Sequence, residues 1–165
     1  NERSDSMKGD ASEDVGRGAP LGGGPPVQIT KAVVEAIKRH GRETYPEEGC
    51  GYLIGPDATP RRIDEFRAAR NIETEDRDLR YRVDPAETLR VTKELAGSGR
   101  DILGFCHSHP DHPARPSATD LERGFTWYTY VIVAVEKGRP VDLRAWSLDD
   151  RDGKRSFREV DIDLV

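Results

Sequence analysis

The chain has 165 residues, of which 35% are hydrophobic and 35% charged, and its formal net charge is -5. This length suits one domain with a single core, and the acidic balance is not typical of nucleic-acid-binding proteins, which cluster positive charge on one face. No apolar run approaches the roughly 20 residues that a membrane helix needs, no stretch has the pattern of a signal peptide, and two cysteines are too few for a disulfide scaffold. We therefore expect a cytoplasmic protein with neither nucleic acid nor membrane as a partner.

Residues 1–26 are rich in Gly, Pro, Ser and Asp and contain almost no core-forming residues. Such a segment cannot bury enough apolar surface to offset the entropy lost on ordering. We predict a flexible tail over residues 1–26, followed by one folded domain over residues 27–165.

The first half of the predicted domain contains one helix and two strands. A helix begins after Thr30, a suitable N-cap, and Gly41 is expected to stop it. The apolar run "GCGYLIGP" at residues 49–56 predicts a strand, and residues 61–68 predict another. The charged stretch that follows, residues 71–83, is expected to form a loop or an edge element.

The second half begins with a helix that Asp84 caps, with Pro85 at its first position and Gly97 near its end. The pattern then predicts a buried strand at 101–109, a short helix at 117–125, strands at 128–136 and 141–149 across a turn at 137–140, and a last strand at 158–165. These elements predict an α/β domain in which helices flank a mixed β-sheet.

The stretch "HSHPDHPARPSATD" at residues 107–120 is the strongest chemical signal. His107 and His109 are two residues apart at the end of a strand, so their side chains point to one face. Asp120 follows in the first turn of the short helix, after a proline-rich loop that restricts the path between them. Two imidazole nitrogens and one carboxylate oxygen suit tetrahedral zinc and leave the fourth position open to water, as in catalytic sites.

A zinc hydrolase also needs a base that takes a proton from the attacking water. Glu47 and Glu48 precede an apolar strand, although a solvated acidic pair is the plainer interpretation of this segment alone. Ser117 lies three residues before Asp120, so its hydroxyl has two possible roles. It caps the short helix, or it donates a hydrogen bond to a developing oxyanion.

The remaining histidines and the cysteines have other interpretations. A fourth protein ligand would close the metal to water, so His112 is interpreted as a substrate-side or solvent residue. His40, at a helix end, is interpreted as structural. Cys50 and Cys106 are interpreted as small buried core residues.

These residues together resemble the JAMM, or MPN+, metallopeptidase family. The motif "HSHP" at residues 107–110, followed by Ser117 and Asp120, has the spacing of that family's signature. The segment "PEEGCG" at residues 46–51 is similar to the family's strand entry and favours Glu48 over Glu47. The resemblance extends from about residue 27 to the C-terminus.

The resemblance implies a JAMM/MPN, cytidine-deaminase-like architecture. It also implies that His107, His109 and Asp120 bind Zn²⁺, that Glu48 moves the proton from water to the leaving amine, and that Ser117 helps hold the oxyanion. The partner implied is a ubiquitin-like or sulfur-carrier protein with a C-terminal diglycine, after which the bond is cleaved. The segment 71–85 and the compact size resemble bacterial stand-alone members that process sulfur carriers, for instance by releasing cysteine from a carrier–cysteine adduct.

Two other functions remain alternatives: a deubiquitinase-like deconjugase of a ubiquitin-like modifier, and a non-catalytic MPN-type binding scaffold. The complete motif is a reason against the scaffold. A zinc nucleobase deaminase is excluded because the Pro-Cys-x-x-Cys ligand pair is absent, and a helical HExxH protease because that motif is absent. In the tail, residues 21–23 (Leu-Gly-Gly) are similar to the end of a ubiquitin-like substrate. They are interpreted as part of a flexible linker. The alternative is that the tail enters the active-site groove of its own chain or of a neighbouring one.

Overall fold

The computed structural model describes residues 26–165, so the predicted tail lies outside the described residues except for its last one. The helices are α2 (Lys31–Thr44), α3 (Pro85–Leu95), α4 (Ala118–Arg123) and the short 3₁₀ helix η1 (Arg151–Gly153). The strands are β1 (Val27–Ile29), β2 (Cys50–Pro56), β3 (Arg62–Ile63), β4 (Glu65–Ala69), β5 (Arg100–Pro110), β6 (Thr129–Glu136), β7 (Arg139–Asp149), β8 (Ser156–Val160) and β9 (Ile162–Leu164).

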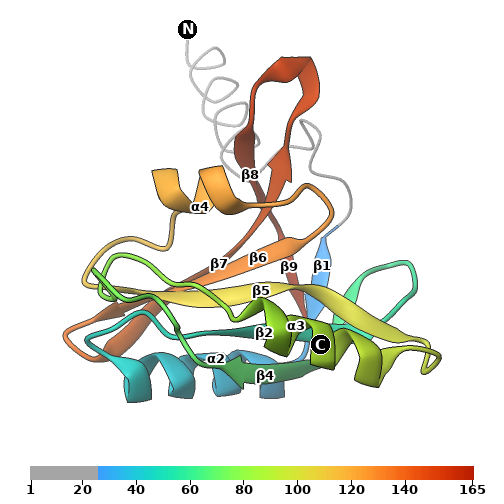
Figure 1. Ribbon diagram of the computed structural model, residues 1–165, viewed down its shortest axis with the longest axis horizontal. Helices are drawn as coiled ribbons and strands as arrows, with labels where there is room; N and C mark the ends of the chain where they lie inside the picture. Colours follow the sequence, from blue (N-terminus) through green and yellow to red (C-terminus); the bar gives the residue numbers. More distant parts are fainter. Residues whose placement is uncertain (1–25) are drawn as a thin grey trace, which may run out of the picture.

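A six-stranded mixed sheet with the order β4-β2-β5-β6-β7-β8 forms the body of the molecule (Figure 1). β5 pairs antiparallel with β2 and parallel with β6. Parallel neighbours need a crossover connection, and here that connection carries α4. A second sheet, with the parallel order β3-β1-β9, lies beside the first.

The two long helices pack on opposite faces of the large sheet. Successive side chains of a strand point to opposite faces, so the residues of β2 that contact each helix show which face it covers. On one face, Ile37 of α2 joins a buried cluster with Leu53 of β2. On the other face, Val91 of α3 joins a cluster with Tyr52 and Ile54, the neighbours of Leu53 along the strand. The predicted fold class, a mixed sheet flanked by helices, is confirmed.

Two predicted strands are each divided between the two sheets. The segment 61–68 contains β3, which pairs with β1, and β4, which pairs with β2, with Asp64 between them. The segment 158–165 likewise contains the end of β8 and all of β9, separated by Asp161. The chain passes from one sheet to the other at each aspartate, a change of partner that strand propensity does not encode.

Two predicted boundaries are also wrong. The turn between β6 and β7 consists of Lys137 and Gly138, with φ values of 50° and 81°, so the two residues after it belong to β7. This two-residue geometry suits a tight hairpin. The first helix does not stop at Gly41 but continues to Thr44.

Gly41 is buried where α2 lies against β6. A Cβ atom at this position would lie 3.0 Å from Cγ2 of Val135 and 3.4 Å from Cγ1 of Val133. The glycine therefore permits close approach of the helix to the sheet and does not end the helix.

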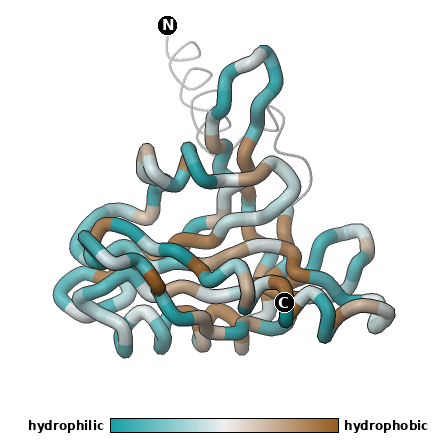
Figure 2. Tube along the Cα trace, in the orientation of Figure 1, coloured by the Kyte–Doolittle hydropathy of each residue, from teal (hydrophilic) through white to brown (hydrophobic). Residues whose placement is uncertain are grey.

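Hydrophobic residues gather in the central strands, whereas the tip of the hairpin between β7 and β8 is hydrophilic (Figure 2). Among residues 26–165, no helix is long and apolar enough to cross a membrane.

Replacing Gly41 with valine should lower the free energy of unfolding by about 2 kcal/mol, because the added methyl groups overpack the contact with β6. Denaturant unfolding measures the change. Arg39→Val, on the exposed face of the same helix, is the control for the effect of a β-branched residue on helix propensity. Equal losses in the two variants would contradict the packing role.

Candidate active site and metal centre

The end of β5 positions His107 and His109 on one face of the sheet, where both are almost completely buried. Ser108, between them, points to the other face and contacts the chain just before β2. Its Oγ accepts a hydrogen bond from the Gly49 N–H at 2.8 Å, and its own N–H donates to the Gly49 carbonyl at 2.9 Å. The strand segment that carries the two histidines is therefore hydrogen-bonded to the residue that follows Glu48.

Asp120 is held by the start of α4. Its Oδ2 accepts the Ser117 N–H at 2.8 Å, and Ser117 Oγ accepts the Asp120 N–H at 3.1 Å, which is a reciprocal capping arrangement. Burial would raise the pKa of the Asp120 carboxyl, but the adjacent His107 and His109 rings and the Ser117 N–H hold that pKa below its ordinary value. The carboxylate is thus ionised and aimed at the two imidazoles.

Three donor atoms converge in this arrangement. His107 Nε2 lies 3.0 Å from His109 Nε2 and 3.1 Å from Asp120 Oδ2, and His109 Nε2 lies 3.4 Å from Asp120 Oδ2. Ligands of a tetrahedral zinc ion, each about 2.0–2.1 Å from the metal, lie about 3.3 Å from one another. The separations of the donor atoms therefore fit one zinc ion.

The tautomer of His109 also leaves one ring nitrogen able to bind a metal ion. Its Nδ1 lies 2.7 Å from the carbonyl oxygen of Pro113, an acceptor only, so Nδ1 carries the proton. The Nε2 lone pair is then free to bind a cation, and this outer hydrogen bond fixes the ring, as is usual for histidine ligands.

Glu48 is 2% exposed, whereas the neighbouring Glu47 side chain is half exposed and forms an ion pair with Arg77. Oε1 of Glu48 has no hydrogen-bond partner among the described residues. A carboxylate oxygen of Glu48 lies within 4.8 Å of a nitrogen of His109. Of the two glutamates, Glu48 is the one that the fold buries beside the cluster of His107, His109 and Asp120.

The backbone of Glu48 is fixed by Asn71, a residue that the sequence pattern did not single out. Asn71 Nδ2 donates to the carbonyls of Glu48 and Arg80 at 3.1 and 3.0 Å. Its Oδ1 accepts the N–H groups of Glu73 and Arg82, both at 3.0 Å. One side chain thereby organises the charged segment 71–83, which forms a loop, and holds it against the site. A lone asparagine in a charged loop carries no sequence signal for this role.

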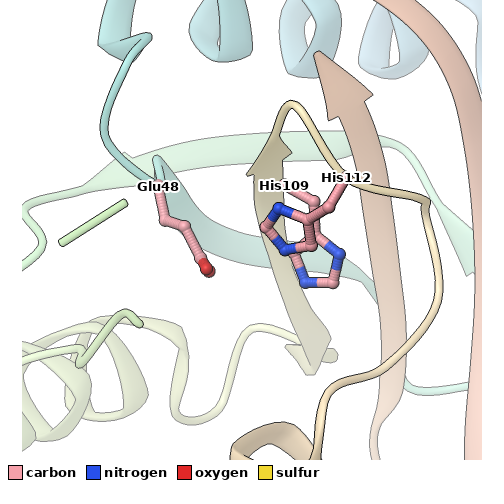
Figure 3. A group of neighbouring side chains, drawn as sticks. All are labelled: Glu48, His109 and His112. Carbon is pink, nitrogen blue, oxygen red and sulfur yellow. The ribbon is translucent and has the colours of Figure 1, made fainter. Parts of the chain in front are cut away.

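Aromatic rings support both histidines of the cluster. Tyr81 stacks on His107, with ring centroids 4.4 Å apart and an interplanar angle of 21°. His112 stacks in the same way on His109, at 4.1 Å and 21° (Figure 3). The structure therefore places His112 against the site, half-buried, while its predicted substrate-side role stays a prediction.

A cavity of about 650 Å³ borders the cluster at His107 and Asp120. Six aromatic side chains contribute to its lining: Tyr81, Phe105, Phe125, Tyr128, Tyr130 and Phe157. An apolar chamber beside a recessed set of metal donors is typical of a binding site for an organic substrate.

His40, Cys50 and Cys106 are not among the grouped donor atoms. His40 is on α2, where its ring packs against Phe66. Cys50 and Cys106 are buried free thiols, as predicted, and burial raises the pKa of Cys50 to about 12 and that of Cys106 further. Neither cysteine is a reactive thiolate.

Comparison with known proteins shows that the chain is similar to members of one family. The family model described as prokaryotic homologs of the JAB domain matches residues 30–149. A desampylase of Haloferax volcanii is 33% identical over 132 residues, which cover 78% of this chain and 88% of that protein. The CysO-cysteine peptidase of Mycobacterium tuberculosis is 29% identical over 123 residues, covering 74% and 82%. A solution structure from Desulfitobacterium hafniense superimposes with a TM-score of 0.70 at 30% identity, covering 84% of this chain and 92% of that one.

The match covers both strands of the site, the intervening loop 71–83 and α4. The relative from Mycobacterium tuberculosis is named as a peptidase, and the donor atoms here fit a zinc ion. The chain therefore belongs to the family of prokaryotic JAB-domain homologs, the JAMM metallopeptidases, and is a zinc-dependent peptidase.

Proposed function

We propose that this peptidase cleaves the peptide or isopeptide bond that follows the C-terminal diglycine of a ubiquitin-like protein. The depth of the donor cluster carries the proposal, because His107 and His109 are 2% and 1% exposed. A segment without side chains reaches such a recessed centre more easily than a segment with bulky ones. The names of the relatives, desampylase and CysO-cysteine peptidase, support the same class of substrate.

Within this class, the first candidate substrate is a sulfur carrier with cysteine attached to its terminal glycine. The second candidate is a ubiquitin-like modifier attached to a lysine side chain of another protein. The identity to the desampylase is a reason to test the second beside the first. The two substrates differ only in the leaving amine, which is an α-amine in one and a lysine ε-amine in the other.

In this proposal His107, His109 and Asp120 hold the zinc ion. When bound, zinc lowers the pKa of a coordinated water and polarises the scissile carbonyl. Glu48 accepts a proton from the attacking water and transfers it to the leaving amine.

Ser117 donates its hydroxyl hydrogen to the developing oxyanion. Its Oγ already accepts the Asp120 N–H, and a hydroxyl that accepts one hydrogen bond still has its own hydrogen to donate. Capping of α4 and stabilisation of the oxyanion are therefore compatible roles of one side chain.

The environment of Glu48 suits a group that gains and loses a proton. Burial is the largest influence and raises the pKa of Glu48 to about 8, against an ordinary value of 4.5, although the neighbouring His109 lowers it. A bound zinc ion would lower this pKa in turn, since it adds positive charge close to the carboxylate.

Glu48→Gln should lower kcat at least 1,000-fold on a carrier–cysteine adduct and on a carrier–lysine isopeptide, while zinc content is unchanged. Glu47→Gln is the matched control and should retain activity. A chelator should abolish cleavage by the parent, and added zinc should restore it. Activity that resists the chelator, or that survives Glu48→Gln, would contradict the mechanism. Failure to cleave either substrate would contradict the proposed substrate class.

In the metal-free protein, Glu48→Gln should raise the free energy of unfolding by about 4 kcal/mol at pH 8 and by little at pH 4.5. A carboxyl whose pKa is raised on folding retains its proton in the folded state but loses it in the unfolded state between those pH values. Stability of the parent therefore falls as pH rises from 4.5 to about 8. Urea unfolding at several pH values measures this, and Glu47→Gln should show no such trend.

Asn71→Ala should lower kcat about tenfold or more, because it removes the hydrogen bond that fixes the Glu48 backbone. The metal content should not change, since the hydrogen bonds of Asn71 to the described residues go to Glu48, Glu73, Arg80 and Arg82 and not to a proposed zinc ligand. Glu75→Gln, an exposed change in the same segment, is the control. An equal loss of activity in the control, or a loss of zinc in Asn71→Ala, would contradict a role in positioning Glu48.

A further inference from the structure

We propose that Glu48 and His112 form a second, weaker metal position beside the zinc site, and that a divalent ion bound there inhibits the peptidase. The inference rests on the proposed function, because the second ion would occupy the carboxylate that serves as the base. Zinc in excess is the ion that these ligand types fit.

The first observation is the grouping of donor atoms. Glu48, His109 and His112 each offer one ligand atom, and the three atoms lie within 4.8 Å of one another (Figure 3). Two ligands of one zinc ion are about 3.3 Å apart in tetrahedral geometry. An approach of no more than about 1.5 Å between the two donor atoms therefore brings the Glu48 carboxylate and the His112 ring to the spacing of a common ion.

The second observation is the orientation of His112. Its Nδ1 lies 2.8 Å from the Pro110 carbonyl oxygen, so Nδ1 carries the proton and Nε2 keeps a free lone pair. The stacked contact with His109 holds the ring beside the cluster. This is the geometry of a histidine ligand whose outer nitrogen is already fixed.

The loop that carries His112 is anchored at Asp111. Asp111 has a φ of 58°, and its Oδ1 accepts the Lys137 N–H at 2.7 Å. Its Oδ2 accepts the hydroxyl of Tyr45 at 2.5 Å. These contacts tie the loop to the β6–β7 turn and to the end of α2, so His112 is not free to leave the site without breaking them.

The third observation is the unpartnered oxygen of Glu48. Oε1 is buried without a hydrogen-bond partner among the described residues, and a buried carboxylate without a partner is stabilised by a cation. Because His109 Nε2 faces His107 and Asp120, the second position has only two protein ligands, with solvent completing the shell. It should therefore bind an ion more weakly than the zinc site.

Calorimetry with zinc chloride tests the second position directly. The parent should bind one ion tightly and a second at least 100-fold more weakly, and His112→Phe, which keeps a stacked ring without a ligand nitrogen, should bind only the first. His40→Phe, the change of a histidine that belongs to neither group of donor atoms, should still bind two. A parent that binds one ion, or a His112→Phe variant that still binds two, overturns the second position and leaves the proposed function intact. A parent that binds none overturns the proposed function instead.

Cleavage measured at rising free zinc tests the inhibition. When free zinc rises from about 1 to about 100 µM, the cleavage rate of the parent should fall about tenfold. The rate of His112→Phe should fall less than twofold, each rate being compared with that of the same protein at the lower concentration. His40→Phe should be inhibited like the parent. Equal inhibition of the parent and His112→Phe would overturn the inhibitory role.

Discussion

Pairing of β5 between β2 and β6 is the constraint on which the active site depends. β5 is a central strand with partners on both sides, and its pairing with β6 is unbroken from Gly104 to Pro110, so the side chains in this part of the strand alternate between the two faces of the sheet. His107 and His109 are thereby committed to the α3 face, and Ser108 to the face that α2 covers. The Ser108 hydroxyl in turn holds the backbone beside Glu48, so one strand orients the histidines and fixes the backbone next to the proposed base.

The two carboxylates beside the histidines acquire different properties from their surroundings. Asp120 accepts a backbone N–H and faces two imidazoles, which together keep it ionised despite burial. Glu48 is buried with an unpartnered oxygen, and burial raises its pKa. A carboxylate that stays charged is suited to hold a cation, and one whose charge is easily lost is suited to move protons.

Local patterns predicted most of the elements and failed where tertiary contacts intervene. The capping residues Thr30 and Asp84 marked the true starts of α2 and α3, because a cap is made with residues two or three positions away. Gly41 has the local pattern of a helix end, but it lies inside α2, where the absence of a side chain permits close packing against β6. Local patterns predict continuous strands through Asp64 and Asp161, but the chain changes sheet at both residues, because the partner of a strand is decided by which strand lies next to it.

The sequence by itself determined the family and the chemical types in the cluster, because the spacing of His107, His109 and Asp120 follows from one strand, one loop and one capped helix. Only the tertiary structure decided that Glu48 is buried beside them, and that Asn71 and His112 support the site. The reason is physical: strand and helix periodicity is a property of neighbouring residues, whereas burial and the approach of distant side chains arise only when the sheet is assembled.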